Sequence, residues 1–376
     1  MESSRFDLAF VIPSKDEEKG IGIVLSQVRE FLEKKGLKGL IVVSDSSKDE
    51  TPKIAKEMGA EVIYPDKNGY GYAYLYAFKY LKKKYGYPRF VVMIDADGTY
   101  DARETEKLLS FAEKADIVLG SRFSGKIEPG AMSLLHRIGN RILNGFLNFF
   151  FKANVSDSHT GFRVVKGEVL EKIDLKCEGM EFASEMIVKA VKNGMKIAEV
   201  PITYRRRAGG EPKIRSFQDG WRHLRFMLLN TPKHLFIYPG ISMLFLGFLL
   251  MIFAIFKIKT FYTPGINSAI AGGFLTLIGF QILSFGMFSN VFNKNKKYLS
   301  LEKNATVGLL LFLFGILLIS GAVLEWISSG FKFLPTSELN VFFMVITALG
   351  LQIIFLSFML SLIEERDRDE KDEKRC

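Results

Sequence analysis

The sequence predicts an α/β domain with a mostly parallel sheet, followed by an all-α transmembrane domain of four helices. Two observations predict this architecture. Strand-like apolar runs alternate with helix-like segments before residue 100, as in repeated βαβ units. After residue 235 the chain contains four apolar segments, each long enough for a helix to cross about 30 Å of hydrocarbon.

The elements of the α/β domain follow from this alternation. Strands are expected at residues 8–12, 39–43, 62–64 and 90–94. Helices are expected between them, at residues 19–35, 53–58 and 72–85. In a parallel sheet of this kind, ligands bind beyond the carboxyl ends of the strands, where the strand order reverses.

Polar clusters follow three of these strands, at residues 13–17, 44–47 and 95–97. The last cluster contains Asp95 and Asp97 at the end of a hydrophobic strand. Two carboxylates in this place are suited to present a hard metal ion to a phosphorylated ligand. Taken alone, the same pattern is also found in solvated turns and helix caps.

We interpret the four apolar segments as transmembrane helices in two hairpins, at residues 235–256, 267–292, 305–327 and 339–363. The connection at 293–303 and the approach to the first segment are basic, which places both in the cytoplasm under the positive-inside rule. No apolar signal segment follows Met1, which agrees with a cytoplasmic amino-terminal domain. The expected parts are a cytoplasmic domain at 1–232, a membrane domain at 233–363 and a charged cytoplasmic tail at 364–376.

The net charge of +10 indicates anionic partners. Nucleic acid, anionic lipid head groups and phosphorylated small molecules are the three kinds to consider, and four membrane spans argue against nucleic acid. The two cysteines, Cys177 and Cys376, have no neighbouring His or Cys at metal-ligand spacing. They predict neither a disulfide framework nor a zinc site.

A series of motifs carries a resemblance to a known family. In chain order they are Val11-Ile12-Pro13 with Asp16-Glu17, the run 43–51, Asp95-Ala96-Asp97, Gly120-Ser121-Arg122, the run 157–163, the run 181–185 and Glu199-Val200-Pro201-Ile202 with Tyr204. This ordered series resembles the inverting GT-A glycosyltransferases of family 2, which have a Rossmann-like domain. The later motifs resemble the branch that glycosylates polyprenyl phosphates, such as the dolichyl-phosphate mannose and glucose synthases, and the membrane hairpins resemble archaeal members.

The resemblance implies a nucleotide-sugar donor and a divalent cation, Mg²⁺ or Mn²⁺, that stabilises the charge of the leaving diphosphate. Asp97 is the expected direct metal ligand, and Asp95 is expected near the ribose or beside the metal. Asp45 is expected to accept a hydrogen bond from the base or ribose. The loop after the first strand would shape the nucleotide pocket through Pro13, Asp16 and Glu17.

Three positions depart from the family pattern near this pocket. Asp16 stands where Asn is common, Ser44 precedes Asp45 where a pair of aspartates is common, and Glu50 stands where Gly is common. The base, GDP or UDP, and the sugar therefore stay open between mannose, glucose and N-acetylglucosamine.

The acceptor, an anionic lipid phosphate, must approach an anionic donor, so cationic side chains are needed to offset the repulsion. Arg122 and Arg137 match the motif positions that hold the lipid phosphate in the mannose synthases. Arg137 precedes an amphipathic run at 142–150, which we expect at the membrane surface.

A second basic cluster consists of Arg205, Arg206, Arg207 and Lys213. One of the three arginines is expected to bind the donor diphosphate, and Arg206, Arg207 and Lys213 are expected in the substrate site. A positive-inside topology signal explains the arginine run equally well.

Two acids have roles that the resemblance suggests. Asp157 corresponds to the expected catalytic base, but a phosphate monoester has a second pKa of about 6 and is already largely ionised, so Asp157 is alternatively a residue that orients the donor sugar. Glu185 is expected in the substrate site, with a packed surface acid as its alternative.

The sequence thus predicts a membrane enzyme that transfers one sugar to dolichyl phosphate at the cytoplasmic face. A polysaccharide or diacylglycerol acceptor is the enzymatic alternative. A membrane scaffold that binds a nucleotide sugar without turnover is the non-enzymatic alternative. A transporter would be expected to have charges within its spans, where only Glu325 is acidic, near a span end.

Overall fold

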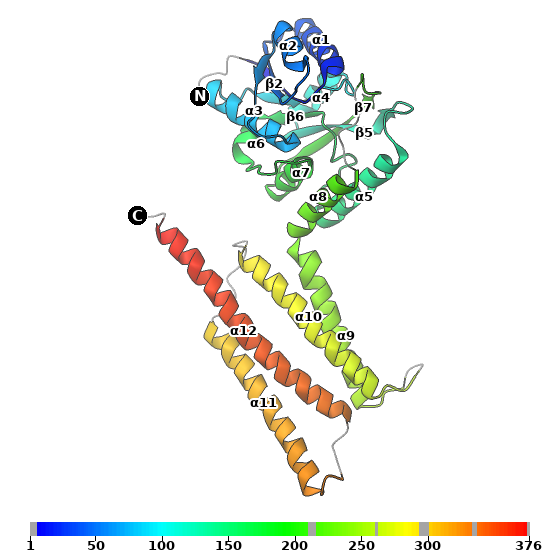
Figure 1. The fold of residues 1–376 in the computed structure, drawn as a ribbon, viewed down its shortest axis with the longest axis vertical. Helices are drawn as coiled ribbons and strands as arrows, with labels where there is room; N and C mark the ends of the chain where they lie inside the picture. The colour runs from blue at the N-terminus through cyan, green and yellow to red at the C-terminus, as the bar shows by residue number, and fades with distance from the viewer. Residues whose placement is uncertain (1–5, 210–215, 260–261, 293–300, 333–336, 374–376) are drawn as a thin grey trace. The chain divides into compact units, whose positions relative to one another are not determined.

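The computed structural model describes residues 6–209, 216–259, 262–292, 301–332 and 337–373 (Figure 1). The chain divides into two compact units, Met1–Met227 and Leu228–Cys376. This division falls a few residues before the boundary expected at 233. Lys213, which is expected in the site, lies outside the described residues.

The first unit is built on a sheet of seven strands in the order β3-β2-β1-β4-β6-β5-β7. The strands are β1 (Leu8–Ser14), β2 (Gly39–Asp45), β3 (Glu61–Ile63), β4 (Phe90–Met93), β5 (Ile117–Ile127), β6 (Arg163–Lys166) and β7 (Ile197–Tyr204). All neighbouring strands are parallel except β6, which runs antiparallel to both β4 and β5. The predicted mostly parallel α/β fold is confirmed.

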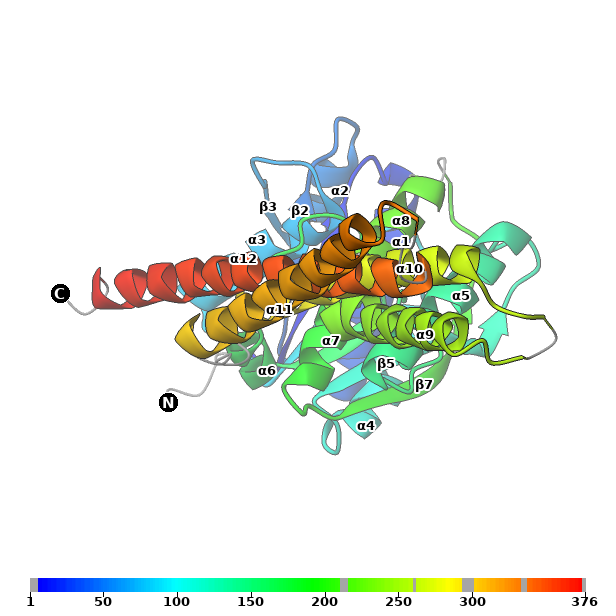
Figure 2. The ribbon, with the colours of Figure 1, turned by 90° about the horizontal axis from the view of Figure 1, so that it is seen from below.

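Helices α1 (Glu18–Lys35), α2 (Thr51–Glu57) and α3 (Tyr70–Lys84) connect the first four strands, within two residues of the predicted bounds. The chain then continues through η1 (Ala102–Glu104), α4 (Thr105–Ala112), α5 (Leu134–Phe151), α6 (Gly167–Lys172), α7 (Phe182–Lys192) and α8 (Ser216–Leu229). These helices cover both faces of the sheet (Figures 1 and 2).

Alternate residues of each central strand supply two separate cores. In β1, Phe10 and Ile12 pack with residues of α1, α2 and α4 on one face of the sheet. Ala9 and Val11 point to the other face, where α3, α5, α6 and α7 contribute. Burial on both faces explains why β1 is a continuous apolar run rather than an alternating one.

The first helix lies close against the turn that carries the two aspartates. A Cβ atom at Gly20 would lie 2.5 Å from the carbonyl oxygen of Ala96. Only glycine therefore allows α1 to approach the 95–97 turn this closely. The packing fixes the turn between the amino-terminal end of α1 and the end of β4.

The second unit contains the four long apolar helices α9 (Tyr238–Ile255), α10 (Ile266–Phe292), α11 (Leu301–Ser328) and α12 (Ser337–Glu373). The spans that are long and apolar enough to cross a membrane are Lys233–Ile255, Ile266–Ser289, Leu301–Ser328 and Ser337–Ile363. Each overlaps one of the four predicted segments.

Glycines allow close packing within each pair of these helices. A Cβ at Gly247 of α9 would lie 2.5 Å from the carbonyl oxygen of Gly272 of α10, and a Cβ at Gly308 of α11 would lie 2.9 Å from that of Gly350 of α12. Small residues at such contacts are typical of helix association in membranes, where close backbone approach replaces the hydrophobic effect as the main source of stability.

Candidate active site

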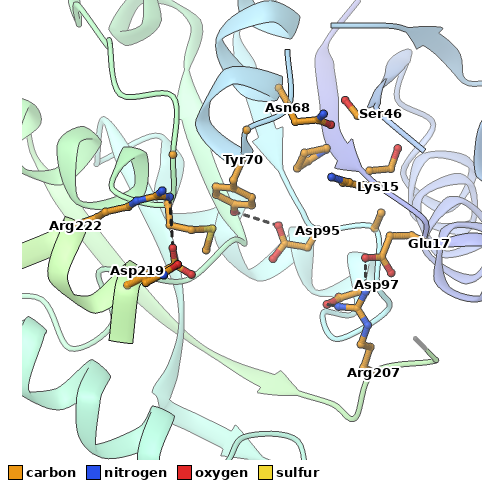
Figure 3. A pocket seen from close by; sticks show the side chains of 18 residues that line it. Lys15, Glu17, Ser46, Asn68, Tyr70, Asp95, Asp97, Arg207, Asp219 and Arg222 are labelled. Carbon is orange, nitrogen blue, oxygen red and sulfur yellow. Dashed lines mark hydrogen bonds and ion pairs between the residues drawn. The ribbon is translucent and has the colours of Figure 1, made fainter. Parts of the chain in front are cut away.

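A pocket of about 490 Å³ lies at the carboxyl ends of the strands in the first unit (Figure 3). Five predicted site residues line it: Pro13, Glu17, Asp95, Asp97 and Arg207. They come from the ends of β1, β4 and β7 and are therefore far apart in sequence. The expectation that polar clusters of different strands meet at one edge agrees with this arrangement.

Asp97 is held by partners on both of its oxygens. Its Oδ1 accepts hydrogen bonds from the backbone N and the Oγ1 of Thr99, at 3.0 and 2.6 Å. Its Oδ2 accepts from Nη1 of Arg207 at 3.0 Å, and the other terminal nitrogen of Arg207 donates to Glu17. One guanidinium thus bridges two carboxylates inside the pocket.

Asp95 lies beside Asp97 and accepts a hydrogen bond from the hydroxyl of Tyr70 at 3.1 Å. Burial and the Asp97 carboxylate together raise the pKa of Asp95 to about 7. A Cβ at position 161 would lie 2.3 Å from Oδ2 of Asp95, so only Gly161 leaves room for this carboxylate.

These carboxylates fit a divalent cation. Asp95 and Asp97 both offer carboxylate oxygens, and a hard cation would offset the burial and the Asp97 charge that disfavour the ionised form of Asp95. Among the described residues, no group of three His, Cys, Asp or Glu side chains is arranged to hold a metal. A Mg²⁺ or Mn²⁺ ion here would therefore take further oxygens from water and from a phosphorylated ligand, as Mg²⁺ usually does.

Asp45 and Asp16 organise the loops that follow β1 and β2 beside the pocket. Asp45 is buried, and its Oδ1 accepts from the hydroxyls of Ser14 and Ser47 at 2.7 and 2.5 Å. Asp16 has a left-handed backbone with φ of 50°, a conformation that Asp and Asn tolerate better than most residues. Its carboxylate accepts from the backbone N of Lys48 at 2.8 Å. Neither residue lines the pocket, and their contact with base or ribose stays a prediction.

Arg122 and Asp157 form a buried bidentate ion pair. Nε and Nη2 of Arg122 each lie 2.7 Å from a different oxygen of Asp157, and the backbone N of Arg122 donates to Oδ2 at 2.9 Å. Only 7% of Arg122 and none of Asp157 is exposed. Burial opposes the charge of Arg122, but the Asp157 carboxylate outweighs it and raises the pKa of Arg122 well above its usual value.

This pairing bears on the expected catalytic base. Both oxygens of Asp157 are engaged by Arg122. The contact that the structure shows for Asp157 is with Arg122, and both of its expected roles, as a base or as a residue that orients the donor sugar, stay predictions. Neither residue is among those that line the pocket.

Glu185 is buried on α7 and does not line the pocket. Its carboxylate accepts from the backbone N of Lys176 at 3.0 Å and of Cys177 at 2.7 Å, and it pairs with Lys189 at 2.7 Å. These contacts fix the segment that leads to Gly179 and Met180, which do line the pocket. Glu185 is thus a packed acid, but a buried one rather than one on the surface, and its expected place in the substrate site stays a prediction.

Arg206 and Arg137 also lie apart from the pocket lining. The backbone N of Arg206 donates to Glu128 at 3.2 Å, and its Nε donates to the carbonyl of Pro129. Arg137 lies in the first turns of α5 and is partly exposed. The expected contacts of Arg206 with a diphosphate and of Arg137 with a lipid phosphate stay predictions.

Helix α8 supplies pocket residues that sequence reasoning missed, namely Gln218, Asp219 and Arg222. In Figure 3, Asp219 and Arg222 lie on the far side of Tyr70 and Asp95 from Lys15 and Ser46. Nothing in the strand and helix pattern of the sequence indicates that this helix returns to the sheet edge.

Two buried histidines, His159 and His223, pack α8 against the rest of the first unit. Nδ1 of His223 lies 2.7 Å from Oγ of Ser184 on α7, and its ring meets that of His159 edge to face at 4.3 Å between centroids. Burial lowers the pKa of His223 to about 4 and that of His159 well below its usual value. Both rings are therefore neutral near pH 7, and α8 is held against the pocket by uncharged contacts.

Family profiles and known proteins similar to this chain all point to one glycosyltransferase family. Residues 9–174 match the profile of "Glycosyl transferase family 2", and residues 289–364 match "Glycosyltransferase family 2 C-terminal transmembrane region". The chain is 42% identical to the low-salt glycan biosynthesis hexosyltransferase Agl6 of Haloferax volcanii, over 95% of this chain and 89% of that protein.

Two further relatives match more than half of the chain. A dolichyl-phosphate hexose transferase of Haloferax volcanii is 34% identical over 57% of this chain and 89% of its own length. A polyprenol monophosphomannose synthase of Mycolicibacterium smegmatis is 30% identical over 54% of this chain and 79% of its own length.

Proposed function

Because the chain belongs to glycosyltransferase family 2 and is a multi-pass membrane enzyme of that family, we propose that it transfers one hexose from a nucleotide sugar to dolichyl or another polyprenyl phosphate. The observation that carries the proposal is the pocket at the strand ends, where Asp95, Asp97 and Glu17 meet Arg207. Two relatives named for polyprenyl-phosphate transfer support the choice of acceptor.

The donor is proposed to lie along this pocket. Pro13 and Ser46 line the nucleoside end, and Arg207 is placed to contact the diphosphate. Asp97, with Asp95 beside it, would hold Mg²⁺ or Mn²⁺, which when bound neutralises charge on the departing nucleoside diphosphate. Asp219 and Arg222, at the other end, are then near the hexose.

The acceptor phosphate is proposed to attack the sugar directly, with inversion to a β-linked product. It needs little help from a base because a phosphate monoester is largely ionised at neutral pH, with a second pKa of about 6. Arg122 and Arg137 would offset its repulsion from the donor diphosphate. In this proposal Asp157 acts by holding Arg122 in place.

Two helices of the first unit expose apolar side chains suited to a membrane surface. On α5, Leu135 and Phe149 are 69% and 68% exposed, and on α8 Phe217 is 89% and Trp221 55% exposed. Such patches of aromatic and aliphatic residues are typical of interfacial helices. We propose that both helices contact the cytoplasmic leaflet, in agreement with the basic segments near the spans.

The test is transfer of radiolabelled sugar into organic-extractable dolichyl phosphate by the full-length protein, with GDP-mannose, UDP-glucose and UDP-N-acetylglucosamine as donors. We expect label in the lipid from one donor, lost on addition of EDTA and restored by Mn²⁺ or Mg²⁺. Label appearing in polysaccharide or diacylglycerol would change the acceptor. Nucleotide-sugar binding without any transfer would favour the scaffold.

Arg207 leads to a prediction about metal binding. Arg207 donates hydrogen bonds to Asp97 and Glu17, so a cation at Asp97 must compete with it. Arg207→Gln is expected to tighten Mn²⁺ binding to the donor-free protein about fivefold, because a partly buried pair of this kind is worth about 1 kcal/mol. It is also expected to weaken donor binding.

A Mn²⁺ titration followed by electron paramagnetic resonance measures the first effect. The matched control is Arg205→Gln, because Arg205 pairs with Asp101 at 2.6 Å and does not line the pocket. An unchanged Mn²⁺ affinity in Arg207→Gln would show that Arg207 and the cation do not compete.

A further inference from the structure

Two asparagines of α5 bind the backbone of the segment that carries Asp157. Nδ2 of Asn148 donates to the carbonyl of Val155 at 2.8 Å, and its Oδ1 accepts from the backbone N of Val155 at 3.0 Å. Nδ2 of Asn144 donates to the carbonyl of Ser156 at 2.6 Å. Its Oδ1 accepts from the backbone N and Oγ of Ser158, at 3.1 and 2.5 Å.

The same segment is held from the sheet by Glu199 of β7. Its two oxygens accept from the backbone N of Ser156 at 2.8 Å and of Asp157 at 2.9 Å. Segment 155–158 belongs to no helix or strand, and side chains therefore satisfy its backbone polar groups. Asp157 is completely buried between the two asparagines and Glu199, and it forms a bidentate ion pair with Arg122.

The two asparagines lie opposite the exposed apolar stripe of α5. Ile142 and Phe146 each lie two residues from Asn144 in the sequence. A separation of two residues corresponds to a rotation of about 200° around the helix axis, so both side chains lie nearly opposite Asn144. They are 54% and 38% exposed, whereas Asn144 is 5% exposed. One face of this helix is thus available to a membrane, and the other is hydrogen-bonded to the segment that positions Arg122.

We propose that Asn144 and Asn148 are positioning residues that connect the membrane-facing helix α5 to the phosphate-binding arginine Arg122, through Asp157. The proposal rests on the proposed function, in which Arg122 contacts the acceptor phosphate. Because no residue of 155–158 lines the donor pocket, the connection acts on acceptor binding and leaves donor binding unchanged.

The test compares Asn144→Ala with the wild-type full-length enzyme in liposomes. We expect the apparent KM for polyprenyl phosphate to rise about tenfold or more, while the affinity for the nucleotide sugar, measured by calorimetry, changes less than twofold. Asn148→Ala, which leaves the contacts of Asn144 intact, is expected to give a smaller rise in the same constant. The matched control is Asn140→Ala, one turn earlier on the same side of α5, which takes no part in these hydrogen bonds and should behave as wild type.

The outcomes separate the two proposals. If the wild type transfers no sugar to lipid, the proposed function fails, and this inference fails with it. If the wild type is active and Asn144→Ala and Asn148→Ala leave the KM for lipid unchanged, the inference alone is wrong. A parallel loss of donor affinity and activity in both variants would show a general structural role and would also overturn it.

Discussion

Asp97→Asn is expected to lower hexose transfer by about 10²–10³-fold, which is the cost of removing one preorganised charge-stabilising group from an active site. The substitution keeps the shape of the side chain and its contact with Thr99. It removes the negative charge that a cation requires and that Arg207 now contacts. Steady-state transfer assays at saturating Mn²⁺ measure the loss.

The same variant is expected to lose Mn²⁺ binding in the absence of donor. Asp174→Asn is a suitable control, because Asp174 is exposed and pairs only locally with Lys176 at 2.9 Å. Full activity in Asp97→Asn would remove Asp97 from the site. Normal Mn²⁺ binding with lost activity would assign it to the donor instead.

The sequence predicts those site residues that come directly after the carboxyl ends of the strands. Asp95 and Asp97 come directly after a buried strand, and parallel strands end at one edge, so the meeting of Asp97 with Glu17 follows from the order of elements alone. The four membrane helices are predictable for a similar reason, since length and apolarity are local properties of the chain.

The remaining features depend on tertiary contacts that no local pattern contains. Asp157 and Arg122 are both recognisable as polar motif residues, but only the fold shows that each neutralises the other in a buried position. The buried position of Glu185 is also not predictable from the sequence, because its carboxylate accepts hydrogen bonds from backbone N–H groups of a loop. Asn144 and Asn148 lie four residues apart in the sequence, and this spacing indicates one polar face on an amphipathic helix.

The second large effect is expected at the buried ion pair. Asp157→Asn and Arg122→Met are each expected to destabilise the full-length protein by about 3–5 kcal/mol, because each leaves its partner's charge buried without compensation. The midpoint of thermal unfolding in detergent measures this loss. Transfer to lipid phosphate is expected to fall in both variants.

The double variant Arg122→Met with Asp157→Leu distinguishes stability from function. Replacing both charges with apolar side chains of similar size removes the uncompensated charge, so the unfolding midpoint should return close to that of the wild type. Transfer should not return, because the cation proposed to contact the acceptor phosphate is still missing. If activity recovered together with stability, Arg122 and Asp157 would be needed only for folding, and the acceptor phosphate would have to be bound by other cations, with Arg137 the first to test.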